Sequence, residues 1–382
     1  MLSGSRMSRD PSAKWHALAG LGLLLAACSN QPRGACDASP QPGKLGTICG
    51  VANPEDVEAV PSAGILVVSE MRFPGRPGGG SLAALTLDRV GKGEAKPRRL
   101  WPPQDTGKAI VGKLDGDPSC TAPPASLSPH GITSAPAAAG KVRLAVVGHE
   151  TREAIELFDL EGRGDDARLL WRGCVPLPPE TSGNDVAIAP DGEIVVSNYA
   201  PDPPMRVSFR ALTVMLAAVL FGRPTGDVMV WKPSNGWRHV EGSKASLPNG
   251  VAVSRDGVTL YFAETATGRV HRLPFHEGGA GKVESLTIPG KPDNLAWTER
   301  GTLLVGTHLS AGAMARCAVG ADPCRSPWGL YEIDPQAWTA REVFRHDGHA
   351  LGAVASATEF GDWLFFGAVY GDRIGVLRVR GS

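Results

Sequence analysis

The sequence lacks the features that identify several common classes of protein. It has no excess charge of either sign, because 39 basic residues are matched by 39 acidic ones, and nothing in its charge predicts nucleic-acid binding. It contains no CxxC motif and no Cys/His spacing of the kind that holds zinc. No linker rich in Pro, Gly or Ser divides the mature chain. These absences favour a single array without zinc and without a nucleic-acid partner.

Apolar runs long enough to span a bilayer are also absent. Residues 17–27 follow three basic residues and are too short to cross a membrane, so residues 1–27 are predicted to be an export signal. The stretch ends in Leu-Ala-Ala followed by Cys28, which is similar to the bacterial lipobox; an ordinary cleaved signal is the alternative. Lipidation of Cys28 would anchor the protein to a membrane without spanning it. Ser29 then predicts the outer membrane, facing the periplasm.

Cysteine is scarce, but its number is informative. Besides Cys28 the chain contains Cys36, Cys49, Cys120, Cys174, Cys317 and Cys324. An even number in an exported chain predicts disulfide bonds. We expect the two local pairs, Cys36–Cys49 and Cys317–Cys324, and the sequence leaves the remaining connectivity open.

Six repeats of one pattern make up the rest of the chain. Each has a short first segment, a turn that usually contains Gly or Asp-Gly, and two apolar strands. The six central strands begin at Gly64, Val142, Gly192, Thr259, Gly301 and Asp362. Repeats of this kind, with a weaker fourth strand, are typical of propeller blades, whereas a β-sandwich or two all-β domains would not need the same internal order. The sequence predicts an all-β, six-bladed β-propeller over 51–382, preceded by an anchor or linker at 28–50.

Polar residues recur at the start of the first segment in five of the six repeats. They are Glu55, Asp56, His130, Asn184, Asp185, Asn249, Asp293 and Asn294. The first strand of each propeller blade lines the central channel, so these side chains should meet on the axis. Gathered carboxylates and amides would repel one another and remain poorly solvated without a cation. Carboxylates and amide carbonyls bind metal ions through oxygen. A ligand set of this kind predicts calcium, with magnesium as the weaker alternative.

Short motifs in these same segments carry a resemblance to a known family. In chain order they are PEDVE at Pro54, FPG at Phe73, SPHGI at Ser128, GHE at Gly148, NDV at Asn184, PNGV at Pro248, DN at Asp293 and TH at Thr307. By their order and blade placement, the chain resembles the paraoxonase and arylesterase family of calcium-dependent, six-bladed lactonases. The resemblance extends from Glu55 almost to the C-terminus.

The resemblance implies two calcium ions with separate ligands. The catalytic ion would be held by Glu55, Asn184, Asn249, Asp293 and Asn294. The structural ion, deeper in the channel, would use Asp56, Asp185 and the backbone carbonyl of Ile132. Neighbouring residues would serve different ions because successive side chains of a strand point in opposite directions.

The resemblance also implies roles for three histidines. His130 would take a proton from the attacking water, and His149 would hold His130 in the correct tautomer and orientation. His308 would bind substrate or assist near the same mouth. Calcium would polarise the carbonyl of a lactone or ester, and a separate base is needed because calcium-bound water is less acidic than zinc-bound water.

Three features depart from the family pattern or interrupt the repeats. Phe73 stands where the family often has tyrosine, so any contact through that hydroxyl is lost. No cysteine follows Cys324, so the disulfide that closes the ring in vertebrate members has no counterpart, and closure must rely on strand pairing or N-terminal packing. Residues 204–222 form an apolar, helix-prone insert. It is predicted to be either a helix packed as core or an active-site lid that touches the lipid surface.

Two other functions fit the same sequence. A sugar lactonase of the gluconolactonase type is also a six-bladed calcium propeller, but it would not need His130 and His149. A lipid-anchored propeller that binds a ligand or a protein, with purely structural calcium, would need no catalytic residues. The sequence therefore predicts a hydrolase of lactones or aryl esters, without naming its substrate.

Overall fold

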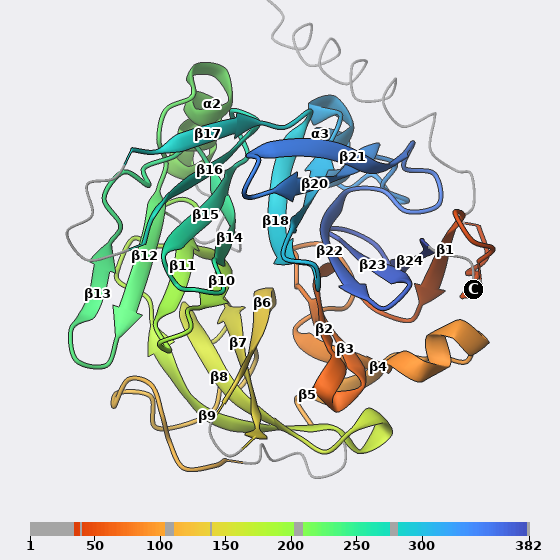
Figure 1. Ribbon diagram of the computed structural model, residues 1–382, viewed down its shortest axis with the longest axis horizontal. Helices are drawn as coiled ribbons and strands as arrows, with labels where there is room; N and C mark the ends of the chain where they lie inside the picture. The colour runs from red at the N-terminus through yellow and green to blue at the C-terminus, as the bar shows by residue number, and fades with distance from the viewer. Residues whose placement is uncertain are drawn as a thin grey trace, which may run out of the picture.

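Six four-stranded antiparallel sheets are arranged in a ring around a central axis (Figure 1). The computed structural model describes residues 34–38, 40–103, 111–137, 140–201, 209–275 and 282–379. The predicted six-bladed β-propeller is confirmed. The export signal and the lipidation of Cys28 concern residues outside the described ranges, and both stay predictions.

The blades follow one another in the chain, and each is numbered here from its innermost strand outward. Blade 1 contains β2 (Pro54–Val60), β3 (Ile65–Glu70), β4 (Ser81–Thr86) and β5 (Arg98–Trp101). Blade 2 contains β6 (Pro129–Pro136), β7 (Val142–Gly148), β8 (Ala154–Glu161) and β9 (Arg168–Pro176). Blade 3 contains β10 (Gly183–Ile188), β11 (Ile194–Asn198), β12 (Asp227–Lys232) and β13 (Gly236–His239).

The second half of the ring repeats this arrangement. Blade 4 contains β14 (Pro248–Val253), β15 (Thr259–Glu264), β16 (Arg269–Pro274) and β17 (Glu284–Thr287). Blade 5 contains β18 (Lys291–Trp297), β19 (Leu303–His308), β20 (Trp328–Asp334) and β21 (Thr339–His346). Blade 6 contains β22 (Val354–Phe360), β23 (Trp363–Ala368), β24 (Arg373–Arg378) and, at its outer edge, β1 (Leu45–Cys49).

A glycine with positive φ stands in the first turn of every blade. These glycines are Gly64, Gly140, Gly192, Gly257, Gly301 and Gly361. A side chain at such a φ would be strained, so glycine permits the tight reversal between the first two strands. The sequence prediction of glycine-containing hairpin turns is confirmed.

Strand pairing closes the ring. β1, from the N-terminal side, pairs antiparallel with β24, from Leu45 opposite Leu377 to Cys49 opposite Arg373. The inner strands also contact one another in circular order, and the last contact joins β22 to β2. The ring is thus closed by strand pairing, one of the two modes of closure expected when no C-terminal cysteine is present. The propeller therefore begins at Leu45, within the segment expected to be a linker.

The six largest clusters of the hydrophobic core each lie between two neighbouring blades. Between blades 1 and 2, Trp101 packs edge-on against Phe158 with ring centroids 4.9 Å apart. Five further clusters fill the other interfaces between successive blades. Apolar burial, at about 25 cal/mol per Å², thus holds blade to blade. The axis is left to the polar side chains of the inner strands.

Helix α2 (Phe209–Phe221) follows β11 and forms the described part of the insert predicted at 204–222. Its apolar side chains include exposed Leu216, Leu220 and Phe221, the last 74% exposed. In the described ranges, no helix combines the length and apolarity that a membrane crossing requires. Whether α2 acts as a lid, core or lipid contact stays a prediction.

Four shorter helical segments complete the part of the fold that the structure describes. α3 (Ala311–Ala318) begins after Ser310, whose hydroxyl accepts a hydrogen bond from the Ala313 amide at 3.2 Å and so caps the helix. Three 3-10 turns are η2 (Pro61–Ala63), η3 (Leu87–Lys92) and η5 (Gly164–Asp166).

Three disulfides are present among the described residues. Cys36–Cys49 and Cys317–Cys324 confirm the two predicted local pairs. The third, Cys120–Cys174, spans a sequence separation of 54 residues and was left open by the sequence. It ties the segment that precedes blade 2 to strand β9.

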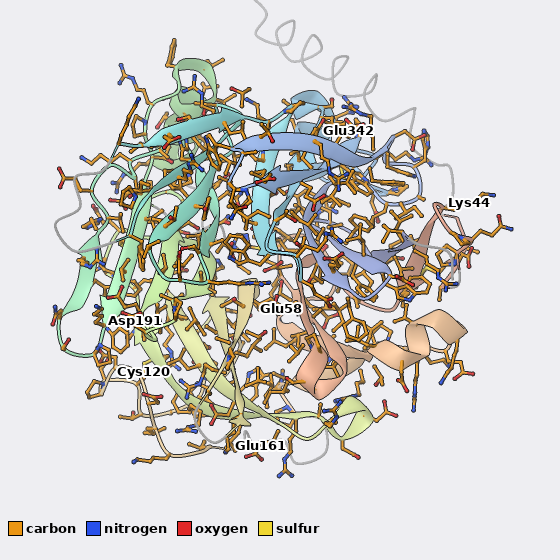
Figure 2. The ribbon with its side chains drawn as sticks, in the orientation of Figure 1. Lys44, Glu58, Cys120, Glu161, Asp191 and Glu342 are labelled. Atoms are coloured by element: carbon orange, nitrogen blue, oxygen red, sulfur yellow. A yellow bond between two sulfur atoms is a disulfide. The ribbon has the colours of Figure 1, made fainter. Side chains whose placement is uncertain are left out.

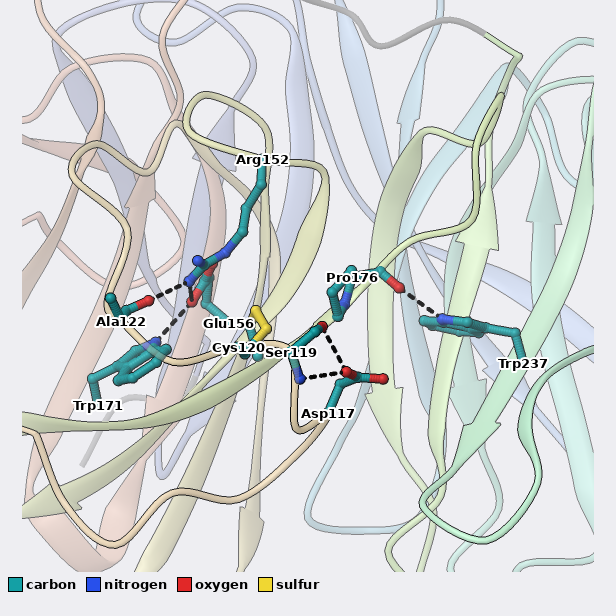
Figure 3. The surroundings of a disulfide bond; sticks show 10 residues. Asp117, Ser119, Cys120, Ala122, Arg152, Glu156, Trp171, Pro176 and Trp237 are labelled. Atoms are coloured by element: carbon teal, nitrogen blue, oxygen red, sulfur yellow. Dashed lines mark hydrogen bonds and ion pairs between the residues drawn. A yellow bond between two sulfur atoms is a disulfide. The ribbon is translucent and has the colours of Figure 1, made fainter.

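Beside Cys120, a buried carboxylate fixes the turn between β7 and β8 (Figure 3). Glu156 accepts one hydrogen bond from Arg152 Nε and another from Trp171 Nε1, both at 2.7 Å. Arg152 also donates to the Ala122 carbonyl at 3.0 Å. The turn is therefore held through Arg152, which bonds both to Glu156 and to the Ala122 carbonyl.

Candidate active site

An extra residue interrupts the pairing of every inner strand with the second strand of its blade, near the start of the inner strand. In blade 1 the register shifts between Pro54 and Asp56, and equivalent shifts occur in the other five blades. Bulges re-aim side chains and are common beside active sites. The residues at these shifts include Glu55, His130, Asn184, Asn249, Asp293 and Ala355. The predicted polar register and the bulges therefore coincide.

Five oxygen-bearing side chains, called the axial ring from here on, are buried at this level. They are Glu55, Asn184, Asn249, Asp293 and Asn294, each no more than 5% exposed. Asn294 Nδ2 donates to Glu55 Oε1 at 3.1 Å, although the two residues are 239 positions apart. The fold thus brings Glu55 of blade 1 into contact with Asn294 of blade 5, two of the side chains expected to meet on the axis.

Among the described residues, four oxygens of the axial ring find no hydrogen-bond partner. They are Glu55 Oε2 and the Oδ1 atoms of Asn184, Asn249 and Asn294. A buried polar atom without a partner costs on the order of 1–3 kcal/mol, and folded proteins contain few such atoms. A cation shared by these predicted ligands would give all four oxygens a partner.

Negative charge is unfavourable here when no cation is bound. Burial raises the pKa of Glu55 well above its ordinary value, and the charges of Asp56, Asp293 and Asp185 raise it further. Burial, followed by the charge of Asp56, likewise raises the pKa of Asp185. A divalent cation would favour the ionised carboxylates and oppose this effect.

The donor chemistry of the axial ring fits calcium. Carboxylate and amide oxygens are ordinary calcium ligands, whereas zinc and copper favour His or Cys. Within the part of the chain that the structure describes, no three His, Cys, Asp or Glu side chains gather as a metal site. The axial ring contains only two carboxylates and draws its other oxygens from amides, so it is not a cluster of that kind. The ligand roles of the five residues stay predictions.

Asp56 and Asp185, predicted to hold a second calcium ion, have a different environment. Their four carboxylate oxygens each accept a backbone N–H at 2.8 Å, from Val57 and Ile132 for Asp56 and from Val186 and Val251 for Asp185. Ile132 thus directs its N–H to Asp56, whereas the prediction concerned its carbonyl. Each of these carboxylate oxygens has a hydrogen-bond partner without a cation, whereas four oxygens of the axial ring have none within the described part of the chain, so the deeper pair supports a metal ion less strongly than the axial ring.

Two glycines make room for these links between blades. Gly131 and Gly250 hold the places in blades 2 and 4 that Asp56 and Asp185 hold in blades 1 and 3. A Cβ on Gly131 would lie 2.5 Å from Asp185 Oδ1, and one on Gly250 would lie 2.4 Å from the Leu295 amide. Acid and glycine therefore alternate around this part of the axis.

His130 and His149 form a buried hydrogen-bonded pair. Nδ1 of His130 lies 3.1 Å from Nε2 of His149. Nε2 of His130 lies 3.4 Å from Asn184 Nδ2 and 3.7 Å from Glu55 Oε1. Burial, and then the charge of His149, lower the pKa of His130 well below its ordinary value. His130 is therefore neutral at pH 7 and able to accept a proton beside the axial ring.

Glu153 extends this pair and was missed by sequence reasoning. Its Oε2 lies 2.7 Å from Nδ1 of His149, and its side chain is 21% exposed. Glu153 stands in the turn between β7 and β8, where acidic residues are common. Its position four residues after His149 was the only available signal.

His308, predicted to bind substrate or to assist, contacts the axial ring. Its Nε2 lies 2.6 Å from Asp293 Oδ2, while its buried Nδ1 has no hydrogen-bond partner. The structure places all three predicted histidines at the axial ring or next to a residue that touches it. Their catalytic roles stay predictions.

Of two surface cavities among the described residues, the smaller lies at the 72–79 loop, and neither His130 nor His149 lines it. Its volume is about 350 Å³, and its wall is formed by residues of the 72–79 loop. In that loop Arg72 Nε lies 3.3 Å from Glu150 Oε2, next to His149, and Phe73 packs against Tyr370 with centroids 5.0 Å apart. The larger cavity, about 690 Å³, lies between blades 4 and 5 and includes no residue of the axial ring.

Two acids of the inner strand β2, Asp56 and Glu58, predict an unusual pH dependence for the calcium-free protein. Burial raises the pKa of Asp56 to about 7 and that of Glu58 to about 7; Glu58 lies near the centre of the ring in Figure 2. Between about pH 4.5 and 7, the folded state therefore keeps protons that the unfolded state has released, and stability falls as pH rises. In chelator, we expect the midpoint of thermal unfolding to drop by at least about 3 °C from pH 5 to pH 8.

The Glu58→Gln variant provides the control for this pH dependence. It removes one titrating group, so its unfolding midpoint should vary less with pH than that of the unsubstituted chain. A midpoint that rises from pH 5 to pH 8 in chelator contradicts the assignment of raised pKa values in the channel.

Comparison with known proteins places this geometry in a family. The family model described as "SMP-30/Gluconolactonase/LRE-like region" matches residues 118–319, which is more than half of the chain. Strictosidine synthase-like 8 of Arabidopsis thaliana is 30% identical over 101 residues. That match covers 26% of this chain, and the chain spans 27% of the length of this curated relative.

Two solved structures share the fold. A luciferin-regenerating enzyme is 14% identical with a TM-score of 0.52, over 88% of this chain and 95% of that one. A gluconolactonase of Xanthomonas campestris is 16% identical with a TM-score of 0.51, over 92% and 99% of the two chains. The paraoxonase resemblance is more specific than what these matches establish. The extent of the family match shows that the chain belongs to the SMP-30/gluconolactonase/LRE-like family.

Proposed function

We propose that the protein is a calcium-dependent hydrolase of lactones, with aryl esters as a second class of substrate. The observation that carries this proposal is the set of four unpaired oxygens in the axial ring, beside a neutral histidine whose Nε2 lies 3.7 Å from Glu55. The family description, which includes gluconolactonase, supports a lactone as the substrate. The resemblance to paraoxonases supports the extension to aryl esters.

The side chains of the site divide the chemistry between them. Calcium in the axial ring would supply a positive charge that polarises the substrate carbonyl. His130 accepts a proton at Nε2 from the attacking water and returns it to the leaving oxygen. Asn184 lies against that same nitrogen at 3.4 Å, so a calcium ligand and the base are neighbours.

A substrate panel tests the proposal. Aliphatic lactones, N-acyl homoserine lactones, a sugar lactone and phenyl acetate are assayed with added calcium and after chelation, and bound calcium is counted by metal analysis. We expect calcium-dependent turnover of at least one lactone. One ion per chain is expected if only the axial ring binds calcium, and two if the deeper site binds it as well. Bound calcium without turnover of any substrate contradicts the proposal and favours a ligand-binding propeller.

A second candidate is a sugar-lactone hydrolase that does not use the histidine pair. The match to the gluconolactonase-containing family favours it, and the axial ring would serve it equally well. The two candidates differ in whether His130 is needed, and the variant His130→Gln distinguishes them.

A further inference from the structure

We infer that Glu153 is the positioning residue of the histidine pair, fixing the tautomers of both rings and balancing the charge that His130 gains. The contacts form one chain. Glu153 Oε2 lies 2.7 Å from His149 Nδ1, and His149 Nε2 lies 3.1 Å from His130 Nδ1. The catalytic part of this inference rests on the proposed function, and its hydrogen-bond part does not.

The direction of each hydrogen bond follows from the carboxylate. An ionised carboxylate only accepts, so His149 carries its proton on Nδ1. In neutral His149 the other nitrogen, Nε2, then accepts, and His130 must donate from Nδ1. Nε2 of His130 is left with the lone pair of the ring, at the site where a proton is to be accepted. Glu153 thereby sets the reactive nitrogen of a residue that it does not touch.

The opposite end of the chain agrees with this assignment. With a lone pair on His130 Nε2, the neighbouring Asn184 Nδ2, 3.4 Å away, is the donor. Asn184 Oδ1 then points elsewhere, and it is one of the four unpaired oxygens of the axial ring. Reversing the tautomers would place two donors against each other at His130 Nε2. The carboxylate of Glu153 and the unpaired Oδ1 of Asn184 therefore indicate the same tautomers for His130 and His149.

The backbone holds Glu153 in place independently of its side chain. The Leu177 amide donates to the Glu153 carbonyl at 2.9 Å. The adjacent Arg152 is bound to buried Glu156 at 2.7 Å (Figure 3). The turn is therefore fixed by neighbouring groups, and the carboxylate of Glu153 is free to act on His149. A positioning group needs a rigid support of this kind.

The proton balance of the step is simple. The water oxygen bonds to the carbonyl carbon while one water proton moves to His130 Nε2, and the protonated ring keeps its Nδ1 proton toward His149. When the bond from carbon to the leaving oxygen breaks, His130 returns the proton to that oxygen. Glu153 takes up no proton, and its negative charge stabilises the positive charge on the pair.

Matched variants test the inference. Glu153→Gln keeps the shape but removes the charge and permits either tautomer, and Glu153→Asp keeps the charge at a longer distance. We expect Glu153→Gln to lower kcat by about 10- to 100-fold with KM changed less than about twofold, and Glu153→Asp to recover part of the loss. Glu150→Gln, in the same turn but with a side chain directed to Arg72, is the control and should keep kcat.

Nitrogen NMR of histidine-labelled protein gives a measurement that does not depend on turnover. The unsubstituted protein should show His149 protonated on Nδ1, and Glu153→Gln should show a mixture of tautomers while its unfolding midpoint stays unchanged. His149 protonated on Nε2 in the unsubstituted protein overturns the inference, whether or not any substrate is hydrolysed. Full kcat in Glu153→Gln also overturns it. If the unsubstituted protein hydrolyses nothing, the proposed function fails, and the NMR result still decides the hydrogen-bond assignment.

Discussion

Glu55→Gln is expected to abolish calcium binding at the axial ring and, with it, nearly all turnover. The substitution preserves size and the oxygen that accepts from Asn294 at 3.1 Å. It removes one of only two carboxylate charges in a ring whose other ligands are neutral amides and Asp293. Loss of that charge should weaken calcium binding by at least about 100-fold, because ligand charge controls the affinity of calcium sites. At limiting calcium, kcat/KM should fall by about 10³-fold.

The stability of the same variant should move in the opposite direction. In chelator, Glu55→Gln removes a buried carboxyl whose pKa is raised by burial and by neighbouring acids. The calcium-free variant should therefore unfold at a higher temperature than the calcium-free original at pH 8. Added calcium should raise the midpoint of the original more than that of the variant, in which only the deeper site could still bind it. Titration calorimetry and thermal unfolding measure both effects.

Glu58→Gln is the matched control for this prediction, since Glu58 lies on the same strand and bonds to Ser134 at 2.6 Å. It should retain calcium binding at the axial ring. Undiminished calcium affinity in Glu55→Gln would show that the unpaired oxygens of the axial ring have another explanation.

The sequence could predict the fold because its determinants are local. Each hairpin is specified by a few adjacent residues, such as the glycine with positive φ at Gly64 or Gly301, and six copies of the pattern reinforce one another. The short disulfide Cys317–Cys324 is local in the same sense, with a separation of 7 residues. Cys120–Cys174 depends on where a long segment crosses blade 2, which no local pattern encodes.

The candidate site was predictable to the level of the strand, but not to the level of the atom. The recurrence of polar residues located the register. A bulge, however, decides that Glu55 is the extra residue of the strand while Asp56 pairs with Ser69. That Asp56 bonds to the Ile132 amide at 2.8 Å depends on the distance between two blades. Periodicity in one strand carries no information about that distance. The family resemblance, and not the repeat pattern, assigned Glu55 and Asp56 to different calcium ions.

Glu153 illustrates the remaining limit of sequence reasoning. Its value to the site comes from a single 2.7 Å contact with His149, and a turn residue has many possible orientations. Glu150 is closer to His149 in sequence, but it points to Arg72 instead. Only the hydrogen bonds that fix the turn distinguish these two acids.

His130→Gln is expected to leave calcium binding intact and to lower kcat by about 10²- to 10⁴-fold, the usual contribution of a general base. Glutamine fills a similar volume but cannot accept a proton at neutral pH. Because His130 contributes none of the unpaired oxygens of the axial ring, calcium affinity should change by less than about threefold. The expected result is thus a loss of kcat without loss of metal, the opposite of the pattern expected for Glu55→Gln.

This prediction also decides between the two candidate activities. His271→Gln is the control, because His271 is a buried histidine bonded to Glu264 at 3.0 Å and to Ser285 at 2.8 Å in blade 4, away from the axial ring. If His130→Gln loses turnover while His271→Gln keeps it, the base acts through the histidine pair. If both variants hydrolyse lactones at the original rate, water is activated without His130. The family's sugar-lactone type of site, built on the axial ring alone, then accounts for the activity better than the paraoxonase-like one.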